Sequence, residues 1–308
     1  MIVYRELSTL ARDLDIPTQT LYALSNNLDR HYRTVKIPKR DGTQRTLSIP
    51  DEALKKTQRA IAEKLLAYEQ ISQYATAYRP TSGIWKNALP HIRKAKLLKL
   101  DILHFFDSIL YSTVKDRVFP ATRYSEPNRI LLAMLCYYRD ALPQGAPTSP
   151  AISNIILRDF DETVGAWCAE RKIAYTRYCD DLSFSGDFDE QAVIEYVTVQ
   201  LKALGFSLNR RKTVVKTNAQ QQSVTGIVVN QKPNISSAYK REIRQAVFYC
   251  KKLGVSEHLQ HIGRTQPPQA YLRSLLGKIN YVLQICPDDP HFLGYRRDIS
   301  ALLRDIEQ

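Results

Sequence analysis

The spacing of apolar residues in the first part of the chain predicts helices on either side of a short β-ribbon. Residues 1–30 are expected to be helical, and residues 36–47 are expected to form two short strands joined by an Asp-Gly turn. Asp51 is a candidate N-cap for a further helix. The apolar face of that helix is predicted at four positions: Leu54, Ile61, Leu65 and Tyr68.

In the middle of the chain, the pattern predicts strands with acidic residues at their ends. Residues 97–102 form a mostly apolar run that leads to Asp101, which predicts a buried strand. Residues 173–185 contain two short runs of β-forming residues separated only by Cys-Asp-Asp. This arrangement predicts a β-hairpin that carries Asp180 and Asp181 at its tip.

Helices are predicted between and after these strands. The predicted helical ranges are 130–138, 153–167, 193–204 and the chain from residue 237 onward. Residues 143–150 are predicted as a loop, and residues 206–208 as a strand that follows Gly205. The order strand, helix, hairpin, helix, strand is typical of an antiparallel sheet backed by helices, which is an α+β arrangement.

Length and charge add a prediction about partners. A chain of 308 residues is expected to divide into two or three lobes. Its 44 Lys and Arg residues outnumber the 31 Asp and Glu residues and give a net charge of +13, which is typical of a protein that binds a polyanion. The basic clusters recur along the chain, at residues 36–45, 93–99, 210–216 and 240–252. This spread favours a long groove over a single patch.

Other classes are disfavoured by what the sequence lacks. No apolar run approaches the length needed to span a membrane, and the first residues do not resemble a signal peptide. The five cysteines are scattered, without a C-x-x-C pair or matching His spacing. We therefore expect a reduced cytoplasmic setting and no zinc site.

The adjacent carboxylates Asp180 and Asp181 are the strongest candidates for chemistry. Two like charges on one turn are costly unless a cation neutralises them, and hard oxygen ligands suit Mg²⁺. If neighbouring strand ends bring Asp101 to the same place, three carboxylates could hold two Mg²⁺ ions for phosphoryl transfer. The alternative is a solvated acidic turn.

Several segments, in the same order along the chain, resemble the motifs of reverse transcriptases. Residues 100–109 (LDILHFFDSI) are similar to the first catalytic motif, and residues 142–150 (LPQGAPTSP) to the loop that positions template and nucleotide. Residues 178–181 (YCDD) resemble the Y-x-D-D box, and residues 205–209 (GFSLN) with Lys212 resemble the lysine-bearing motif that follows. A fingers motif precedes them at residues 37–45, so the resemblance extends from about Lys36 to Asn230.

Two shorter segments resemble the retron branch of that family. Residues 87–91 fit its N-A-x-x-H element, and residues 224–226 fit its V-T-G element. The resemblance implies a right-hand polymerase with fingers, an antiparallel-sheet palm and a helical thumb. The domains it implies are residues 1–95 (N-terminal helices and fingers), 96–235 (palm, with a fingers insertion near 112–142) and 236–308 (thumb).

The resemblance also implies roles for individual residues. Asp101, Asp180 and Asp181 would be catalytic metal ligands, assisted by the backbone carbonyl of Ile102. Phe106 corresponds to the bulky residue that excludes a ribonucleotide 2′-OH, whereas Phe105 fits a core position.

Further candidates would contact the nucleotide. Gln144 would touch the incoming nucleotide, and Gly145 would let the backbone approach it. Arg45 is the first candidate for gripping the triphosphate from the fingers, with Lys39 and Arg40 beside it. Lys212 would donate a proton to the pyrophosphate leaving group, although a solvated lysine is the alternative reading.

The remaining candidates would contact primer or RNA. Tyr178 would pack near the primer terminus. The candidates for binding the cognate RNA are Asn87, His91, Val224, Thr225 and Gly226. Without the resemblance, His91 would be interpreted as a structural histidine. The basic C-terminal helices would follow the template–primer duplex through its phosphates.

The function implied is that of a retron reverse transcriptase. Such an enzyme copies a structured noncoding RNA of the msr-msd type into single-stranded DNA (msDNA) from dNTPs. Priming from a guanosine 2′-OH gives a branched RNA–DNA, and the systems generally serve in anti-phage defence with an effector or toxin protein. The alternatives are a group II intron-like or diversity-generating reverse transcriptase, an RNA-dependent RNA polymerase and a catalytically silent RNA-binding scaffold.

Overall fold

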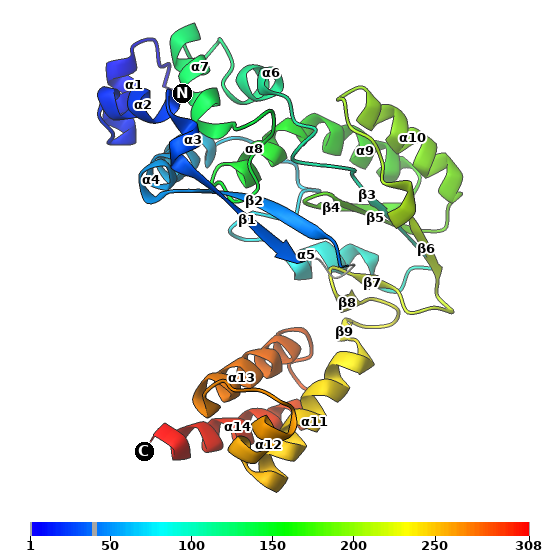
Figure 1. Cartoon of the computed structure of the whole chain (residues 1–308). Helices are drawn as coiled ribbons and strands as arrows, with labels where there is room; N and C mark the ends of the chain where they lie inside the picture. The colour runs from blue at the N-terminus through cyan, green and yellow to red at the C-terminus, as the bar shows by residue number, and fades with distance from the viewer. Residues whose placement is uncertain (1, 39–41, 308) are drawn as a thin grey trace. The chain divides into compact units, whose positions relative to one another are not determined.

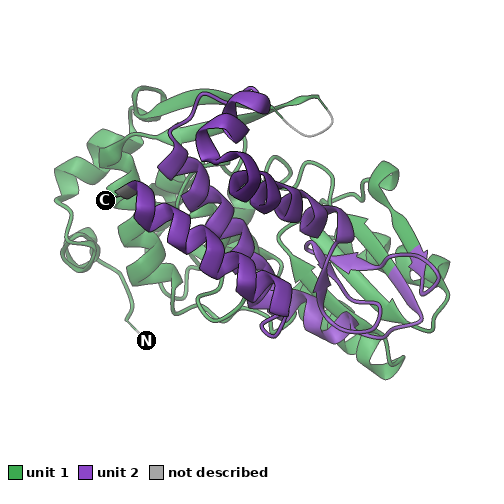
Figure 2. Cartoon of the chain, turned by 90° about the horizontal axis from the view of Figure 1, so that it is seen from below, with its two compact units in different colours: residues 1–83, 98–215 green, residues 84–97, 216–308 purple. Residues whose placement is uncertain are grey.

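The computed structural model describes residues 2–38 and 42–307. By internal contacts the chain divides into two compact units. Unit 1 comprises residues 1–83 and 98–215, and unit 2 comprises residues 84–97 and 216–308 (Figure 2). The chain thus leaves unit 1 and re-enters it, so neither unit is one continuous segment. The three domains expected from the family resemblance stay a prediction.

Unit 1 begins with the helices and ribbon that the sequence predicts. The helices are α1 (Leu7–Leu14), α2 (Thr18–Ser25) and α3 (Leu28–His31), followed by strands β1 (Tyr32–Pro38) and β2 (Gln44–Pro50). The two strands pair antiparallel, with Tyr32 opposite Pro50 and Ile37 opposite Arg45, and form the long ribbon of Figure 1. The predicted turn includes Asp41, which with Lys39 and Arg40 lies outside the described residues.

Helix α4 (Glu52–Ile61) starts where its cap was predicted. The Asp51 carboxylate accepts a hydrogen bond of 2.9 Å from the Leu54 backbone N–H, which satisfies one of the free N–H groups at the helix start. A π-helical turn, η1 (Ala62–Leu66), continues the helix. Leu54, Ile61 and Leu65 are buried as expected, but Tyr68 is 80% exposed. Its assignment to the apolar face was wrong because the helical segment ends before it.

The central sheet of unit 1 brings the acidic strands together. Its order is β4-β5-β3-β6, where β3 is Lys96–Asp101 and β6 is Val214–Thr217. Strands β4 (Ala174–Tyr178) and β5 (Asp181–Gly186) form an antiparallel hairpin, with Tyr178 opposite Asp181. The predicted buried strand and the predicted hairpin are therefore both confirmed.

The predicted strand at residues 206–208 is wrong. Only Leu208 makes a β-bridge, to Ile102, and the 3-10 turn η4 (Arg210–Lys212) follows directly. The Phe206 side chain is buried in the core, and the Ser207 carbonyl accepts a hydrogen bond of 2.8 Å from the Leu103 N–H. These contacts fix a short extended segment, and the fourth strand of the sheet forms later in the chain.

Helices complete unit 1 around the sheet. Between β3 and β4 lie α6 (Tyr111–Thr113), the π-helical turn η3 (Val114–Val118), α7 (Glu126–Cys136), α8 (Ser149–Ile156) and α9 (Arg158–Glu170), and α10 (Glu190–Lys202) follows β5. The single helix expected at residues 153–167 is in fact two, α8 and α9, which meet at Leu157. Apolar residues of α9 and α10 share one core with the sheet, which fixes the sheet against its helical layer (Figure 1).

Unit 2 has its own apolar core. It contains α5 (Ile84–Ala88), the 3-10 turn η2 (Leu89–His91), and three short strands, β7 (Ser223–Val224), β8 (Ile227–Val228) and β9 (Asn234–Ile235). Four helices follow: α11 (Ser237–Leu253), α12 (Val255–His261), α13 (Pro268–Ile285) and α14 (Pro290–Glu307). Ile243, Val247 and Cys250 are buried in this core, as their helical spacing predicts. No helix in the described part of the chain has the length and apolar character needed to cross a membrane.

Candidate active site

Three carboxylates meet where β3 ends beside the tip of the β4–β5 hairpin. The Ile102 N–H, directly after Asp101, donates a hydrogen bond of 3.0 Å to the carbonyl of Asp180. Cys179 has a positive φ of 60°, which turns the chain sharply between the two strands. We call Asp101, Asp180 and Asp181 the carboxylate cluster. The structure thus brings together the three acidic residues singled out in the sequence.

The electrostatics of the carboxylate cluster favour a cation. Burial raises the pKa of the Asp181 carboxyl group, and the negative charges of Asp180 and Asp101 raise it further, while Lys99 and Lys212 lower it. Such mutual repulsion between carboxylates is relieved when a positive ion lies between them. The cluster is therefore a region of concentrated negative charge in a chain that is basic overall.

Asp101 already has two polar partners. Its carboxylate accepts hydrogen bonds from Lys212 Nζ at 2.8 Å and from Asn209 Nδ2 at 3.2 Å. The bond to Asp101 also raises the pKa of the Lys212 ammonium group, which keeps it protonated. The predicted proton donor therefore lies at the cluster. Asn209 stood in the same motif, but sequence reasoning gave it no role.

The donor set suits Mg²⁺, although it does not form a complete cage. Within residues 2–38 and 42–307, no group of three or more His, Cys, Asp and Glu side chains is already arranged to hold a metal ion. Mg²⁺ is commonly bound by one or two carboxylates together with substrate phosphates, so a complete protein cage is not required. Three oxygen-bearing carboxylates that repel one another fit this mode of binding.

Phe105 and Phe106 occupy different environments beside the cluster. Phe105 is 4% exposed and belongs to the core, whereas Phe106 is half-buried. Their ring centroids lie 5.1 Å apart. The Phe106 carbonyl accepts a hydrogen bond of 3.1 Å from the Leu142 N–H, which joins residues 100–109 to the 142–150 loop.

The 142–150 loop is attached to the β-ribbon. The Gln144 carbonyl accepts a hydrogen bond of 3.0 Å from the Ser48 N–H of β2. Gly145 has φ +125°, and a Cβ atom there would lie 2.8 Å from the Ser48 carbonyl oxygen. A side chain is therefore excluded by the ribbon backbone, a packing reason for glycine that the sequence could not show. Contact of Gln144 and Gly145 with a nucleotide stays a prediction.

Two further candidates of unit 1 lie on strands. Arg45 is exposed on β2, and Tyr178 is half-buried at the end of β4, where it packs against the core. Their proposed contacts with triphosphate and primer stay predictions.

The candidates for RNA binding gather in unit 2. Asn87, His91 and Val224 are buried, while Thr225 is half-buried and Gly226 is exposed. Asn87 Nδ2 donates to Thr225 Oγ1 at 3.4 Å, and the Thr225 hydroxyl donates to the Ile84 carbonyl at 3.2 Å. The two retron-like segments therefore contact each other within one unit, and their role in binding RNA stays a prediction.

A buried ion pair beneath the hairpin was missed by sequence reasoning. Arg177 on β4 and Asp161 on α9 are both fully buried and contact each other at 2.6 Å. The available signal was one arginine within the apolar, β-rich run before Tyr178. A charged residue at such a position is rarely buried without a partner.

Comparison with known proteins agrees with this geometry. The family model described as reverse transcriptase (RNA-dependent DNA polymerase) matches residues 37–244. The retron Ec83 reverse transcriptase of Escherichia coli is 34% identical over 238 residues, which cover 72% of this chain and 76% of the relative. The retron Ec86 reverse transcriptase of Escherichia coli is 29% identical over 265 residues, which cover 84% and 82%.

A solved structure supports the fold. The foamy viral protease-reverse transcriptase in complex with double-stranded DNA aligns with a TM-score of 0.50 at 14% identity. The alignment covers 89% of this chain and 44% of the viral chain, so this chain spans less than half of that protein. The chain belongs to the reverse transcriptases, the RNA-directed DNA polymerases, and within them to the retron group.

Proposed function

We propose that the carboxylate cluster is the catalytic centre at which this polymerase copies RNA into DNA. The observation that carries the proposal is the Ile102–Asp180 backbone hydrogen bond, which joins the end of β3 to the hairpin tip, where the charges of Asp180 and Asp101 act on the Asp181 carboxyl group. The three carboxylates, with the Ile102 carbonyl, would hold two Mg²⁺ ions. When bound, these ions would supply the charge that activates the attacking hydroxyl and neutralises the leaving pyrophosphate.

The residues around the cluster would prepare the substrates. Lys212 is held protonated by Asp101 and would donate its proton to the pyrophosphate oxygen. The half-buried ring of Phe106 would occupy the space of a ribose 2′-OH and so favour dNTPs over ribonucleotides. Gln144 and Gly145 of the 142–150 loop would contact the nucleotide, and Arg45 would bind its triphosphate.

The template would be a structured noncoding RNA. Support comes from the retron relatives and from the net charge of +13, which suits a polyanionic partner. Priming from an RNA 2′-OH would give a branched RNA–DNA that contains msDNA. We further propose that the enzyme works with an effector protein in anti-phage defence.

Removal of the paired carboxylates tests the catalytic proposal. The double variant Asp180→Asn and Asp181→Asn should keep RNA affinity but lose Mg²⁺-dependent dNTP incorporation by about a thousandfold or more, because the metal ligands are gone. Asp159→Asn, which changes an exposed carboxylate on α9, is the matched control and should keep its activity. Unchanged synthesis by the double variant would contradict the assignment of the site.

The product tests the retron proposal. Expression of the gene with its flanking DNA should give a short, abundant DNA on a denaturing gel. RNase or debranching treatment should shift that band if the DNA is joined to RNA through a 2′-OH. Absence of such a species in cells that express active enzyme would contradict the branched product.

A further inference from the structure

The ion pair beneath the catalytic hairpin has a two-pronged geometry. Arg177 Nε donates to Asp161 Oδ1 at 2.8 Å, and Arg177 Nη2 donates to Asp161 Oδ2 at 2.6 Å. The Tyr175 hydroxyl donates to the same Oδ1 at 2.8 Å. Because two parallel bonds fix the plane of the guanidinium group, the direction of its third nitrogen is fixed as well.

That third nitrogen is directed at the hairpin tip. Arg177 Nη1 donates to the carbonyl of Cys179 at 3.1 Å and to Asn154 Oδ1 at 3.1 Å. The Cys179 carbonyl belongs to the peptide bond that leads into Asp180. The arginine therefore holds the peptide that carries the first of the paired catalytic carboxylates.

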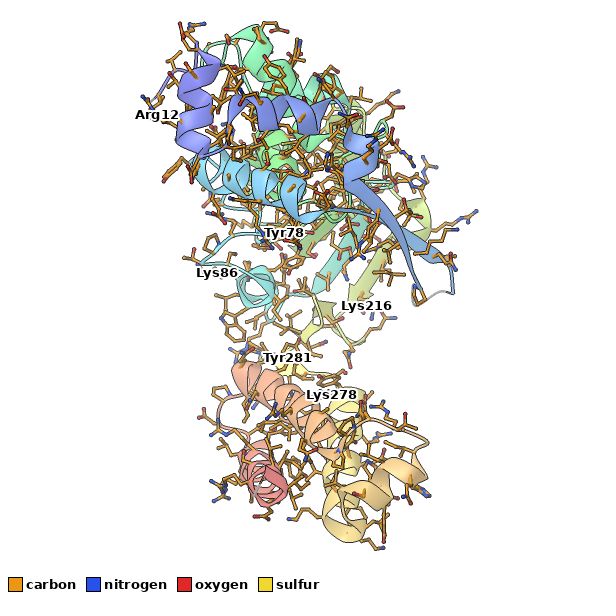
Figure 3. All side chains as sticks on the ribbon, turned by 60° about the vertical axis from the view of Figure 1, so that its left-hand side comes forward. Arg12, Tyr78, Lys86, Lys216, Lys278 and Tyr281 are labelled. Carbon is orange, nitrogen blue, oxygen red and sulfur yellow. The ribbon has the colours of Figure 1, made fainter. Side chains whose placement is uncertain are left out.

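Residues 76–78 form further hydrogen bonds with β4 and the hairpin tip. The Arg177 carbonyl accepts two hydrogen bonds from Thr76, from its N–H at 2.8 Å and from its hydroxyl at 2.9 Å. Tyr78, which Figure 3 labels, donates its hydroxyl to Cys179 Sγ at 3.3 Å. Residues 76–78 thus hold β4 and its tip through bonds that do not involve the carboxylates.

Stability alone does not explain an arginine at this position. Burial of two charges is costly, and apolar residues of similar volume often stabilise a core equally well or better. Arg177 and Asp161 are both without exposed side-chain surface. Unlike an apolar pair, the Arg177–Asp161 pair supplies a hydrogen-bond donor, Arg177 Nη1, whose direction is fixed.

We propose that Arg177, oriented by Asp161, is a positioning residue that sets the hairpin tip so that Asp180 and Asp181 meet Asp101. Asp180 is then held through the peptide groups on both of its sides, by Arg177 at the Cys179 carbonyl and by the Ile102 N–H at the Asp180 carbonyl. The inference rests on the proposed role of the carboxylate cluster in binding metal.

Arg177→Lys tests the inference because lysine keeps the charge but loses the planar fork. The ammonium group of a lysine would pair with Asp161 as a point charge and would no longer donate a hydrogen bond to the Cys179 carbonyl. We expect kcat for dNTP incorporation to fall by about tenfold or more, with KM for dNTP within about twofold. Mn²⁺ titration followed by electron paramagnetic resonance, with dNTP bound, should show half-saturation at a higher Mn²⁺ concentration.

Arg129→Lys is the matched control. Arg129 is also nearly buried, donates to the Phe119 carbonyl at 2.7 Å and pairs with Asp116 and Glu126, outside the carboxylate cluster. Both the Arg129→Lys and the Arg177→Lys variants should have a lower melting temperature, but Arg129→Lys should keep kcat and Mn²⁺ affinity near those of the original protein. If kcat and Mn²⁺ affinity fell equally in the two variants, Arg177 would have a structural role only, and the proposal would be overturned.

A milder variant covers the case in which Arg177→Lys fails to fold. Tyr175→Phe removes only the hydroxyl donated to Asp161 and leaves the arginine fork in place. It should lower kcat by about two- to fivefold and weaken Mn²⁺ binding in the same direction. Unchanged kcat and Mn²⁺ affinity would overturn the proposal, whereas activity in the Asp180→Asn and Asp181→Asn double variant would instead refute the catalytic site itself.

Discussion

Phe105 and Phe106 are neighbours in sequence, yet only Phe105 is fully buried in the core. Phe105 packs 5.8 Å from Phe206, measured between ring centroids, within the buried core of unit 1. Phe106, which follows the end of β3, is half-buried. Phe105 therefore stabilises the fold, whereas the half-buried Phe106 is the one that we propose to contact a nucleotide.

Phe106→Ala should weaken discrimination against ribonucleotides. Removal of the ring opens the space in which a 2′-OH would otherwise clash, so the preference for dNTP over rNTP should fall by about tenfold to a hundredfold. Single-nucleotide incorporation with each substrate, expressed as the ratio of kcat/KM values, measures this preference. If the ratio stays constant, another residue provides the selection.

Phe105→Leu is the control for that experiment. The change removes core volume and should cost about 1 kcal/mol of unfolding free energy. The ratio of dNTP to rNTP incorporation should not move.

At the scale of elements, the sequence predicts what depends on local pattern. The β1–β2 ribbon, the Asp51 cap and the β4–β5 hairpin each follow from residues close together in the chain, and all three are confirmed. The conformation of residues 206–208 depends on contacts with distant segments, such as the Leu103–Ser207 hydrogen bond. Local periodicity contains no information about those partners.

In the candidate active site too, the sequence predicts the residues in motifs but not the contacts between distant segments. The carboxylate cluster could be proposed because the acidic residues lie in recognisable motifs. The Arg177–Asp161 pair could not, because its partners belong to a strand and a helix whose packing no local pattern specifies. Gly145 was singled out for contact with a nucleotide, which stays a prediction, and its close approach to Ser48 depends on how the ribbon meets the loop.

Gly145→Ala tests the attachment of the 142–150 loop to β2. The added Cβ would lie 2.8 Å from the Ser48 carbonyl oxygen, and the φ of +125° is unfavourable for alanine. We expect a loss of about 1–3 kcal/mol of unfolding free energy and a higher KM for dNTP, since the loop must shift. Chemical denaturation and steady-state kinetics measure the two effects.

Gly294→Ala provides the comparison for stability. Gly294 lies in α14, and a Cβ atom there would have no neighbour within 4 Å. Alanine should therefore keep or raise the unfolding free energy, by up to about 1 kcal/mol. A similar loss in both variants would contradict the steric explanation for Gly145.

His91, in the retron-like segment at residues 87–91, should make the stability of the fold depend on pH. Burial, together with the smaller effect of the Lys94 charge, lowers the pKa of His91 to about 3. The unfolded chain then binds a proton near pH 6.5 that the folded protein rejects, so stability is present above that pH and is lost as pH falls toward 3. Between pH 8 and pH 5 the loss from His91 should be about 2 kcal/mol.

His91→Gln measures that contribution. Glutamine does not titrate, so the variant should lose about 2 kcal/mol less than the original protein over the same pH range. Denaturant unfolding at pH 8 and pH 5 gives the comparison. Equal pH dependence in both proteins would show that His91 is not buried in its neutral form.

At the scale of the whole molecule, the dominant property is positive charge. Basic residues occur in both units and give the chain an excess of 13 positive charges. Helix α11 carries exposed basic residues along its length, among them Arg241 and Arg244. Lys240 on the same helix is already paired with Asp289 at 2.9 Å. Fewer than the 44 Lys and Arg side chains of the sequence are therefore available to a polyanion, although the net charge of +13 is unchanged by such pairs.

RNA affinity should fall steeply with salt, and less steeply after charge is removed from α11. Replacement of Arg241 and Arg244 by Gln should reduce the slope of log K against log salt concentration by about one to two, because two phosphate contacts are lost. Fluorescence anisotropy between 50 and 200 mM salt, roughly the range in which such contacts are lost, measures the slope.

Arg5→Gln with Arg12→Gln removes the same amount of charge from the N-terminal region. This variant should leave the slope nearly unchanged, because both residues precede the ribbon and lie on another part of the chain. Equal reductions in the two variants would indicate diffuse attraction without a binding surface on α11.

The discontinuous makeup of unit 2 has a consequence for how the protein is made. Residues 84–97 carry Ala88 and Leu97 of the unit 2 core, but the rest of that core lies beyond residue 216. During translation this early segment leaves the ribosome more than a hundred residues before its partners, a delay on the order of ten seconds. A ribosome that stalls in between leaves the segment uncovered, so premature termination there should yield chains that aggregate or are degraded.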